Sequence, residues 1–175
     1  MIHGTIEQSI LTHMRRLLTF AVLAAALALP AGSAAQREGA NDGTLSIKDA
    51  RGTIIIAARG AVIGSFASGN VRIVDPVGGD GTGPIVTGQE FHKELDEKTD
   101  VYRGTKVRFR LIGGFFRVRI QGRGINLSLV GKGTVTLNGA GTDDDGTYSV
   151  NGGAYGTVPD FSFVFPLSAS SAPTQ

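Results

Sequence analysis

The sequence predicts an all-β fold, a Gly-rich antiparallel β-sandwich or barrel, behind an N-terminal export signal. Short runs rich in Val, Ile, Thr and Phe recur along the chain, and Gly and Asx turns separate them about every ten residues. Almost no stretch after residue 36 has helical periodicity. Many short strands divided by regular turns are typical of sandwiches and barrels, so the 26 glycines indicate turns in a folded domain.

The N-terminal region has the three-part order of a secretory signal peptide, which we assign to residues 14–35. A pair of arginines precedes thirteen residues, Leu17 to Leu29, in which a threonine is the only polar one. Small residues follow, and we expect cleavage after Ala35, with Ala34 as the alternative. A membrane span needs about 20 apolar residues, so we expect no transmembrane segment in the mature form.

The mature chain is predicted to be one secreted domain, extracellular, periplasmic or associated with the cell envelope. We interpret residues 1–13 as an artefact of start assignment, 36–167 as the β domain and 168–175 as a disordered tail. There is no cysteine, which excludes disulfides, thiol nucleophiles and thiolate metal sites. Basic residues total 17 and acidic residues 15, so the net charge favours no particular partner.

Each predicted strand is a run of β-branched and apolar residues that ends at a Gly or Asx turn. Gly113-Gly114 lies between two such runs and predicts a hairpin turn. The expected strands are residues 44–48, 53–58, 61–66, 70–75, 85–87, 102–112, 115–121, 125–130, 134–138, 147–150 and 161–165.

The domain contains an internal sequence repeat. Residues 53–75 align without a gap on 117–139, with five identities, and the pattern extends the related halves to 45–75 and 109–139. This predicts a duplicated β-meander whose two sheets face each other across one core. Two hairpins of similar composition are the alternative explanation, and a β-solenoid is the rival architecture. The insertion, 76–106, holds a polar stretch expected to form a helical turn or two, or a long loop.

A run of basic residues marks the first candidate site. No acidic residue occurs between residues 101 and 142, and side chains alternate across a strand. With a hairpin at 113–114, two arginine rows would lie side by side on one solvent-exposed sheet face and could bind a polyanion. The alternative is an ordinary solvated face that discourages aggregation. The candidate residues are Lys106, Arg108, Arg110, Arg117, Arg119 and Arg123.

Two further sets of residues are weaker candidates. Asp143, Asp144 and Asp145 place hard oxygen ligands on a turn, as calcium requires, without the spacing of an EF-hand loop. His92, the only histidine after the signal, has several acidic neighbours but no partner histidine and no Gly-x-Ser-x-Gly motif.

These observations favour an exported, non-enzymatic binding or structural module that contacts an anionic polymer or another envelope component. No nucleic-acid motif is present, and no aromatic residues interleave with the arginines on their predicted sheet face for base stacking. Two alternatives stay open: a small secreted hydrolase that uses Asp or Glu, and a calcium-stabilised structural domain. Oligomeric state and ligand identity do not follow from the sequence.

Overall fold

The computed structural model describes residues 39–142 and 144–174. The chain divides into two compact units, residues 1–34 and 35–175, and all described residues belong to the second. The predicted signal peptide and the segment before it therefore lie outside the described residues. Within the described ranges, no helix has the length and apolar character needed to cross a membrane.

The regular structure of the described ranges is a single antiparallel sheet, which confirms the predicted all-β class. Two strands are very long, β1 (Gly43–Val74) and β4 (Thr99–Gly139). Five short strands complete the sheet: β2 (Gly81–Thr87), β3 (Phe91–Asp96), β5 (Thr147–Val150), β6 (Gly156–Thr157) and β7 (Phe163–Leu167).

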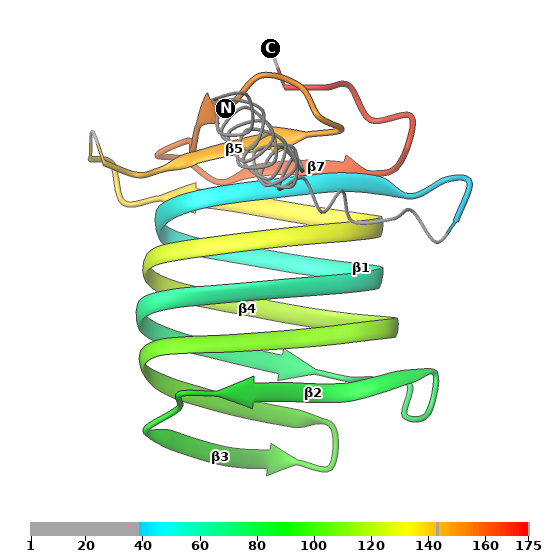
Figure 1. The fold of residues 1–175 in the computed structure, drawn as a ribbon, viewed down its shortest axis with the longest axis vertical. Helices are drawn as coiled ribbons and strands as arrows, with labels where there is room; N and C mark the ends of the chain where they lie inside the picture. The colour runs from blue at the N-terminus through cyan, green and yellow to red at the C-terminus, as the bar shows by residue number, and fades with distance from the viewer. Residues whose placement is uncertain (1–38, 143, 175) are drawn as a thin grey trace, which may run out of the picture. The chain divides into compact units, whose positions relative to one another are not determined.

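The two long strands wind together into a coil. Thr53 of β1 pairs with Gln121 on one side and with Asn138 on the other, and Ser65 pairs with both Arg108 and Asn126. The two partners are 17 or 18 residues apart in β4, so one turn of the coil takes that many residues. Figure 1 shows the turns stacked on each other, with β2 and β3 at the lower end and β5 and β7 at the upper end.

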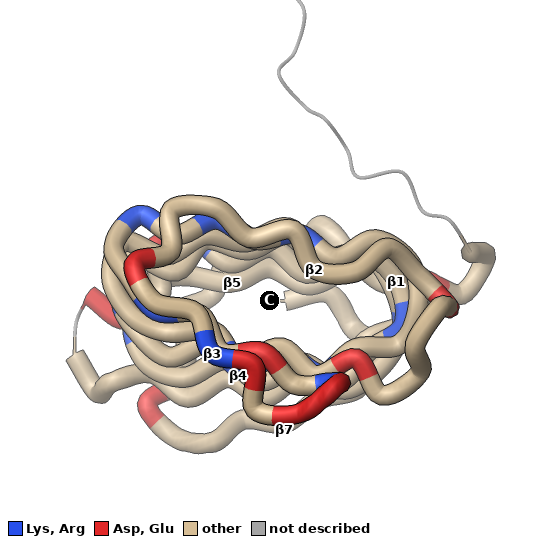
Figure 2. Tube along the Cα trace, turned by 90° about the horizontal axis from the view of Figure 1, so that it is seen from below, with Lys and Arg blue, Asp and Glu red and all other residues tan. Residues whose placement is uncertain are grey.

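The coil is flattened, so it has two broad faces on either side of one core (Figure 2). We call them the first and the second face. The first face consists of β2, β5 and residues 44–48, 61–66, 107–112 and 125–130 of the long strands. The second consists of β3, β7 and residues 53–58, 70–74, 99–103, 115–121 and 133–138.

Side chains along each strand point alternately into the core and to solvent, and the inward side chains fill the core. On the second face, Val71, Ile120, Ile54 and Leu137 form one inward row across neighbouring turns, and all four are buried. The residues between them, including the arginines of β4, point to solvent. Burial of this apolar surface is the main driving force for folding, and the period-two pattern of the sequence reflects it.

Glycines form the corners between the two faces. Gly60 has a φ of 145° and pairs with Gly131, and a Cβ on Gly60 would lie 2.2 Å from the carbonyl oxygen of Val130. Gly69 and Gly122 stand in the same relation at the other corner. An L side chain disfavours a positive φ and has no room here, so glycine lets successive turns bend in close contact.

Three local predictions are wrong. Gly113-Gly114 is not a hairpin turn, because β4 runs through it and crosses from one face to the other. The polar stretch after Glu90 forms β3, paired with the start of β4, and not a helical turn or loop. The tail, expected to be disordered, packs on the upper end, where Thr174 Oγ1 accepts the N–H of Val150 at 2.8 Å.

The two halves of the predicted repeat lie mainly in β1 and β4. Ile54 and its counterpart Val118 are both buried, as are Val71 and Val135, but Ile63 is exposed where Leu127 is buried. The two faces meet across one core, as a sandwich requires, yet they are alternating halves of one coiled sheet. The arrangement is closer to the rival solenoid than to two meanders.

Candidate functional site

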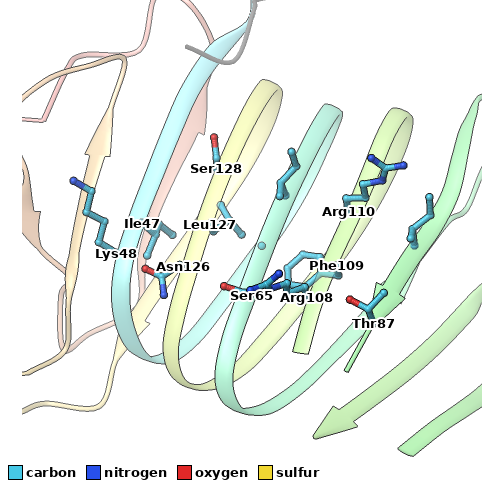
Figure 3. Close-up of a pocket in the computed structure, with 13 residues that line it drawn as sticks. Ile47, Lys48, Ser65, Thr87, Arg108, Phe109, Arg110, Asn126, Leu127 and Ser128 are labelled. Atoms are coloured by element: carbon cyan, nitrogen blue, oxygen red, sulfur yellow. The ribbon is translucent and has the colours of Figure 1, made fainter. Parts of the chain in front are cut away.

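The first face carries a groove of about 640 Å³. It crosses five neighbouring strand segments (Figure 3), from β2 through successive passes of β4 and β1 to Lys48. At about 4.8 Å between strands, this corresponds to a length of about 19 Å. The groove therefore runs across the strands, along the axis of the coil.

Two rows of outward side chains form the walls of the groove. One row contains Ile85, Arg110, Ile63 and Ser128, and the other contains Thr87, Arg108, Ser65, Asn126 and Lys48. The rows are two residues apart along each strand, or about 6.7 Å. Between them runs an inward row whose Phe109 ring packs beneath Gly64, so the backbone forms the floor.

The electrostatic character of the groove is positive. Lys48, Arg108 and Arg110 line it, and no carboxylate does. Among the described residues, ion pairs within 4 Å involve only Arg59–Asp80 and His92–Asp100. The three cations of the groove thus have no acidic partner there. The isoleucines between them are unusually open for large apolar side chains, with Ile63 59% and Ile85 41% exposed.

Lys106 extends the positive region toward one corner. A second hollow, lined by Lys106 and Arg108, shares Ser65, Arg108 and Asn126 with the groove. Lys106 has a φ of 56° and no partner in the ladder, although the pairs on either side of it, Phe66 with Val107 and Ser68 with Thr105, keep the same register. A lysine in the left-handed region is strained by about 1 kcal/mol or more.

The predicted cations do not form one patch. Arg108 and Arg110 belong to the first face and Lys106 lies at the corner beside it, but Arg117 and Arg119 lie on the second face, and Arg123 lies at a corner opposite Ser68. The hairpin assumption placed the two arginine rows side by side, whereas β4 turns the corner at 113–114. Lys48, Ile63 and Ile85 were missed, since they reach the groove from neighbouring turns.

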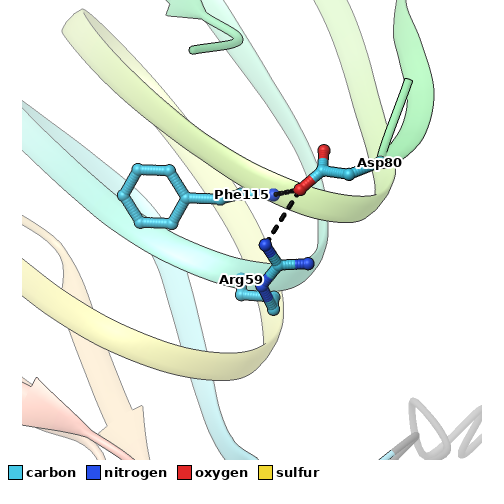
Figure 4. A network of polar contacts seen from close by, with 3 residues as sticks. All are labelled: Arg59, Asp80 and Phe115. Carbon is cyan, nitrogen blue, oxygen red and sulfur yellow. Dashed lines mark hydrogen bonds and ion pairs between the residues drawn. The ribbon is translucent and has the colours of Figure 1, made fainter. Parts of the chain in front are cut away.

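Arg59, outside both faces, is already neutralised (Figure 4). Its Nη2 lies 2.9 Å from Asp80 Oδ2, which also accepts the N–H of Phe115 at 3.1 Å. This contact ties the loop before β2 to a corner of the coil. Arg59 therefore has less electrostatic attraction left for a ligand than the unpaired arginines of the groove.

The acidic turn serves the fold. Asp145 is buried, and its carboxylate accepts hydrogen bonds from the hydroxyl and N–H of Thr142 and from the N–H of Gly141. Burial opposes its ionisation, but these hydrogen bonds outweigh that effect and lower the pKa of Asp145 below 3.8. Asp144 is exposed, and Asp143 lies outside the described residues. No group of three metal-ligating side chains occurs in the described part of the chain.

Several acidic residues lie at the lower end of the coil, as the red segments around β3 show in Figure 2. His92 Nε2 lies 2.6 Å from Asp100 Oδ1, and the imidazole stacks on Tyr102 at 4.5 Å between ring centres. Burial, helped by the charges of Asp100 and Glu94, raises the pKa of Tyr102. This cross-strand pairing could not be read from the sequence because it depends on the β3–β4 register.

No family model matches this chain, and no curated protein or solved structure matches it either. The chemistry of the groove is therefore the basis for assigning a function.

Proposed function

We propose that this protein is an exported, non-enzymatic binding module that holds a linear anionic polysaccharide in the groove of the first face. The observation that carries the proposal is the lining of the groove. Lys48, Arg108 and Arg110 surround it, and no carboxylate of the described residues does. Lys48 Nζ lies over the Tyr155 ring, 3.9 Å from its centroid, whereas Arg108 and Arg110 take part in none of the ion pairs among the described residues. Guanidinium groups bind carboxylate or sulfate oxygens through paired hydrogen bonds, so an anionic ligand satisfies the two arginines that the fold leaves free.

The shape of the groove favours a chain. It is about 19 Å long, and the Cα atoms of the two side-chain rows that border it are about 6.7 Å apart, so an extended ligand along the coil axis meets both rows. Ser65, Ser128 and Asn126 offer hydrogen-bonding groups at successive positions along it. Ile63 and Ile85 supply exposed apolar contacts that suit the C–H faces of sugar rings.

Other anionic partners fit less well. Nucleic-acid strands are usually held by stacking on exposed aromatic rings, and the one aromatic residue of the lining, Phe109, is buried under Gly64. A membrane surface would meet the rims of the groove but not its floor. A hydrolase that uses two carboxylates needs both beside the substrate, and the groove lining has none.

The test is retention of the purified protein on immobilised heparin over a salt gradient. Replacing Arg108 and Arg110 with Gln should weaken binding roughly tenfold for each arginine, because a hydrogen bond to a charged group contributes about 1.5 kcal/mol. The variant should elute at lower salt, since fewer ionic contacts are screened. Circular dichroism checks that both proteins are folded.

The matched control is Arg51→Gln with Lys132→Gln, which removes two exposed cations that do not line the groove. We expect this variant to elute close to the wild type. Equal loss in both double variants would mean that net charge alone explains retention. Equal or stronger binding of the wild type to single-stranded DNA or anionic vesicles would also contradict the polysaccharide assignment.

A further inference from the structure

The second face carries a separate cationic surface. Arg72 of β1 and Arg119 of β4 are direct partners on neighbouring strands, and both are exposed. Arg117 precedes Arg119 by two residues on the same face, and Arg103 lies near the lower end of this face. We call Arg72, Arg103, Arg117 and Arg119 the second-face arginines.

The direct pairing of Arg72 with Arg119 destabilises the folded protein when no ligand is bound. Like charges directly opposite each other in a sheet are destabilising. None of the second-face arginines forms one of the ion pairs found among the described residues. Asp96 is near enough for Arg72 to contribute to lowering its pKa, but the N–H of Lys98 is the larger cause. A bound anion would relieve the repulsion between Arg72 and Arg119, which Asp96 offsets only in part and no ion pair among the described residues compensates.

The two cationic surfaces point away from each other. The inward rows of both faces meet in one apolar core, and the arginines of each face occupy the outward positions. Figure 2 shows these faces as opposite sides of the flattened coil. One stiff polymer segment that occupies the groove of the first face cannot reach the second-face arginines at the same time.

We infer that each molecule binds two anionic polysaccharide chains, one on each face, and so cross-links them. This inference rests on the proposed function, because it takes the ligand of the groove as its first partner. The second-face arginines line neither the groove nor the hollow beside it, so the second chain is held mainly by charge and is released at lower salt than the first.

A sandwich assay tests cross-linking. The protein is bound to heparin beads, the beads are washed at low salt, and fluorescent heparin is added in solution. The wild type should capture soluble heparin. The variant Arg72→Gln with Arg119→Gln should still bind the beads but capture less than a tenth as much. The Arg51→Gln, Lys132→Gln protein should behave as the wild type does.

The outcomes separate the two claims. A wild type that binds the beads and captures no soluble heparin overturns cross-linking and leaves the groove assignment standing. Capture that is unchanged in the Arg72→Gln, Arg119→Gln variant also overturns it, because bridging would then come from self-association or from the groove alone. Failure of the wild type to bind the beads at all overturns both. Light scattering of the free protein identifies self-association directly.

Discussion

At the scale of single residues, what separates the cations of this protein is whether the fold already uses them. Arg59 is held by Asp80, whereas Arg108 and Arg110 border a groove without carboxylates. Unpaired surface arginines at neighbouring positions contribute little to stability, and facing ones reduce it. These arginines therefore contribute more to ligand binding than to the stability of the fold.

Asp145 shows the opposite case, a charge that serves the fold alone. Replacing it with Ala leaves the N–H groups of Gly141 and Thr142 without their acceptor. Lost hydrogen bonds to a charged group should lower the free energy of unfolding by about 2 kcal/mol. Urea denaturation at pH 7 measures this change, and a loss below about 0.5 kcal/mol would contradict the role assigned to Asp145.

The pH dependence of stability gives a second readout for the same residue. Because the pKa of Asp145 is lower in the folded state, its contribution is complete above pH about 4 and is lost as the pH falls through the folded-state pKa. We expect the wild type to lose more stability than Asp145→Ala between pH 5 and pH 2. Parallel losses would show that other carboxylates dominate acid unfolding.

At the scale of elements, the paired glycines at the corners determine where β1 and β4 bend. Gly60 requires a positive φ and lies against the backbone of Val130. Changing Gly60 to Ala should destabilise the protein by about 3 kcal/mol, because strain in φ and a backbone clash add together. The melting temperature should fall by roughly 10 °C.

Gly83 provides the matched control for this change. It lies in β2, and a Cβ there meets nothing within 4 Å. Gly83→Ala should alter stability by less than about 0.5 kcal/mol. Similar melting temperatures for the two alanine variants would show that the corners tolerate side chains and that the corner glycines do not determine the shape of the coil.

Some features of the strands could be predicted from the sequence, and others could not. Alternation of apolar and polar residues is a local pattern, so the strand class and the outward position of Arg108, Arg110, Arg117 and Arg119 could be predicted. The coil could not, because most β1 residues have two partners in β4, and local patterns do not specify which segments pair. A Gly-Gly pair looks the same at a hairpin turn as at a corner.

One signal in the sequence could have revealed the coil. Glycines recur at 17 residues, from Gly43 to Gly60, from Gly52 to Gly69 and from Gly122 to Gly139, which equals the length of one turn. That spacing would have separated the two arginine rows by half a turn. It would also have placed residues 47–48 and 63–65 about one turn apart on the same face, but it would not have related them to residues 108–110, which belong to the other long strand.

At the scale of the whole molecule, the coil converts one strand pair into two opposite cationic surfaces with a shared core. Several acidic residues lie around β3, at the lower end of the second face, and no described carboxylate lines the groove of the first face. The net charge is close to zero, yet each face presents positive charge. Average composition therefore conceals a distribution suited to anionic partners.

Lysine footprinting shows whether the groove of the first face holds an anionic chain. The purified protein is acetylated at low reagent concentration with and without excess heparin, and each lysine is quantified by mass spectrometry. We predict strong protection of Lys48 and Lys106, which line the groove and the hollow beside it, and little protection of Lys98 and Lys132. Uniform protection of all four, or none at Lys48 and Lys106, would contradict the account.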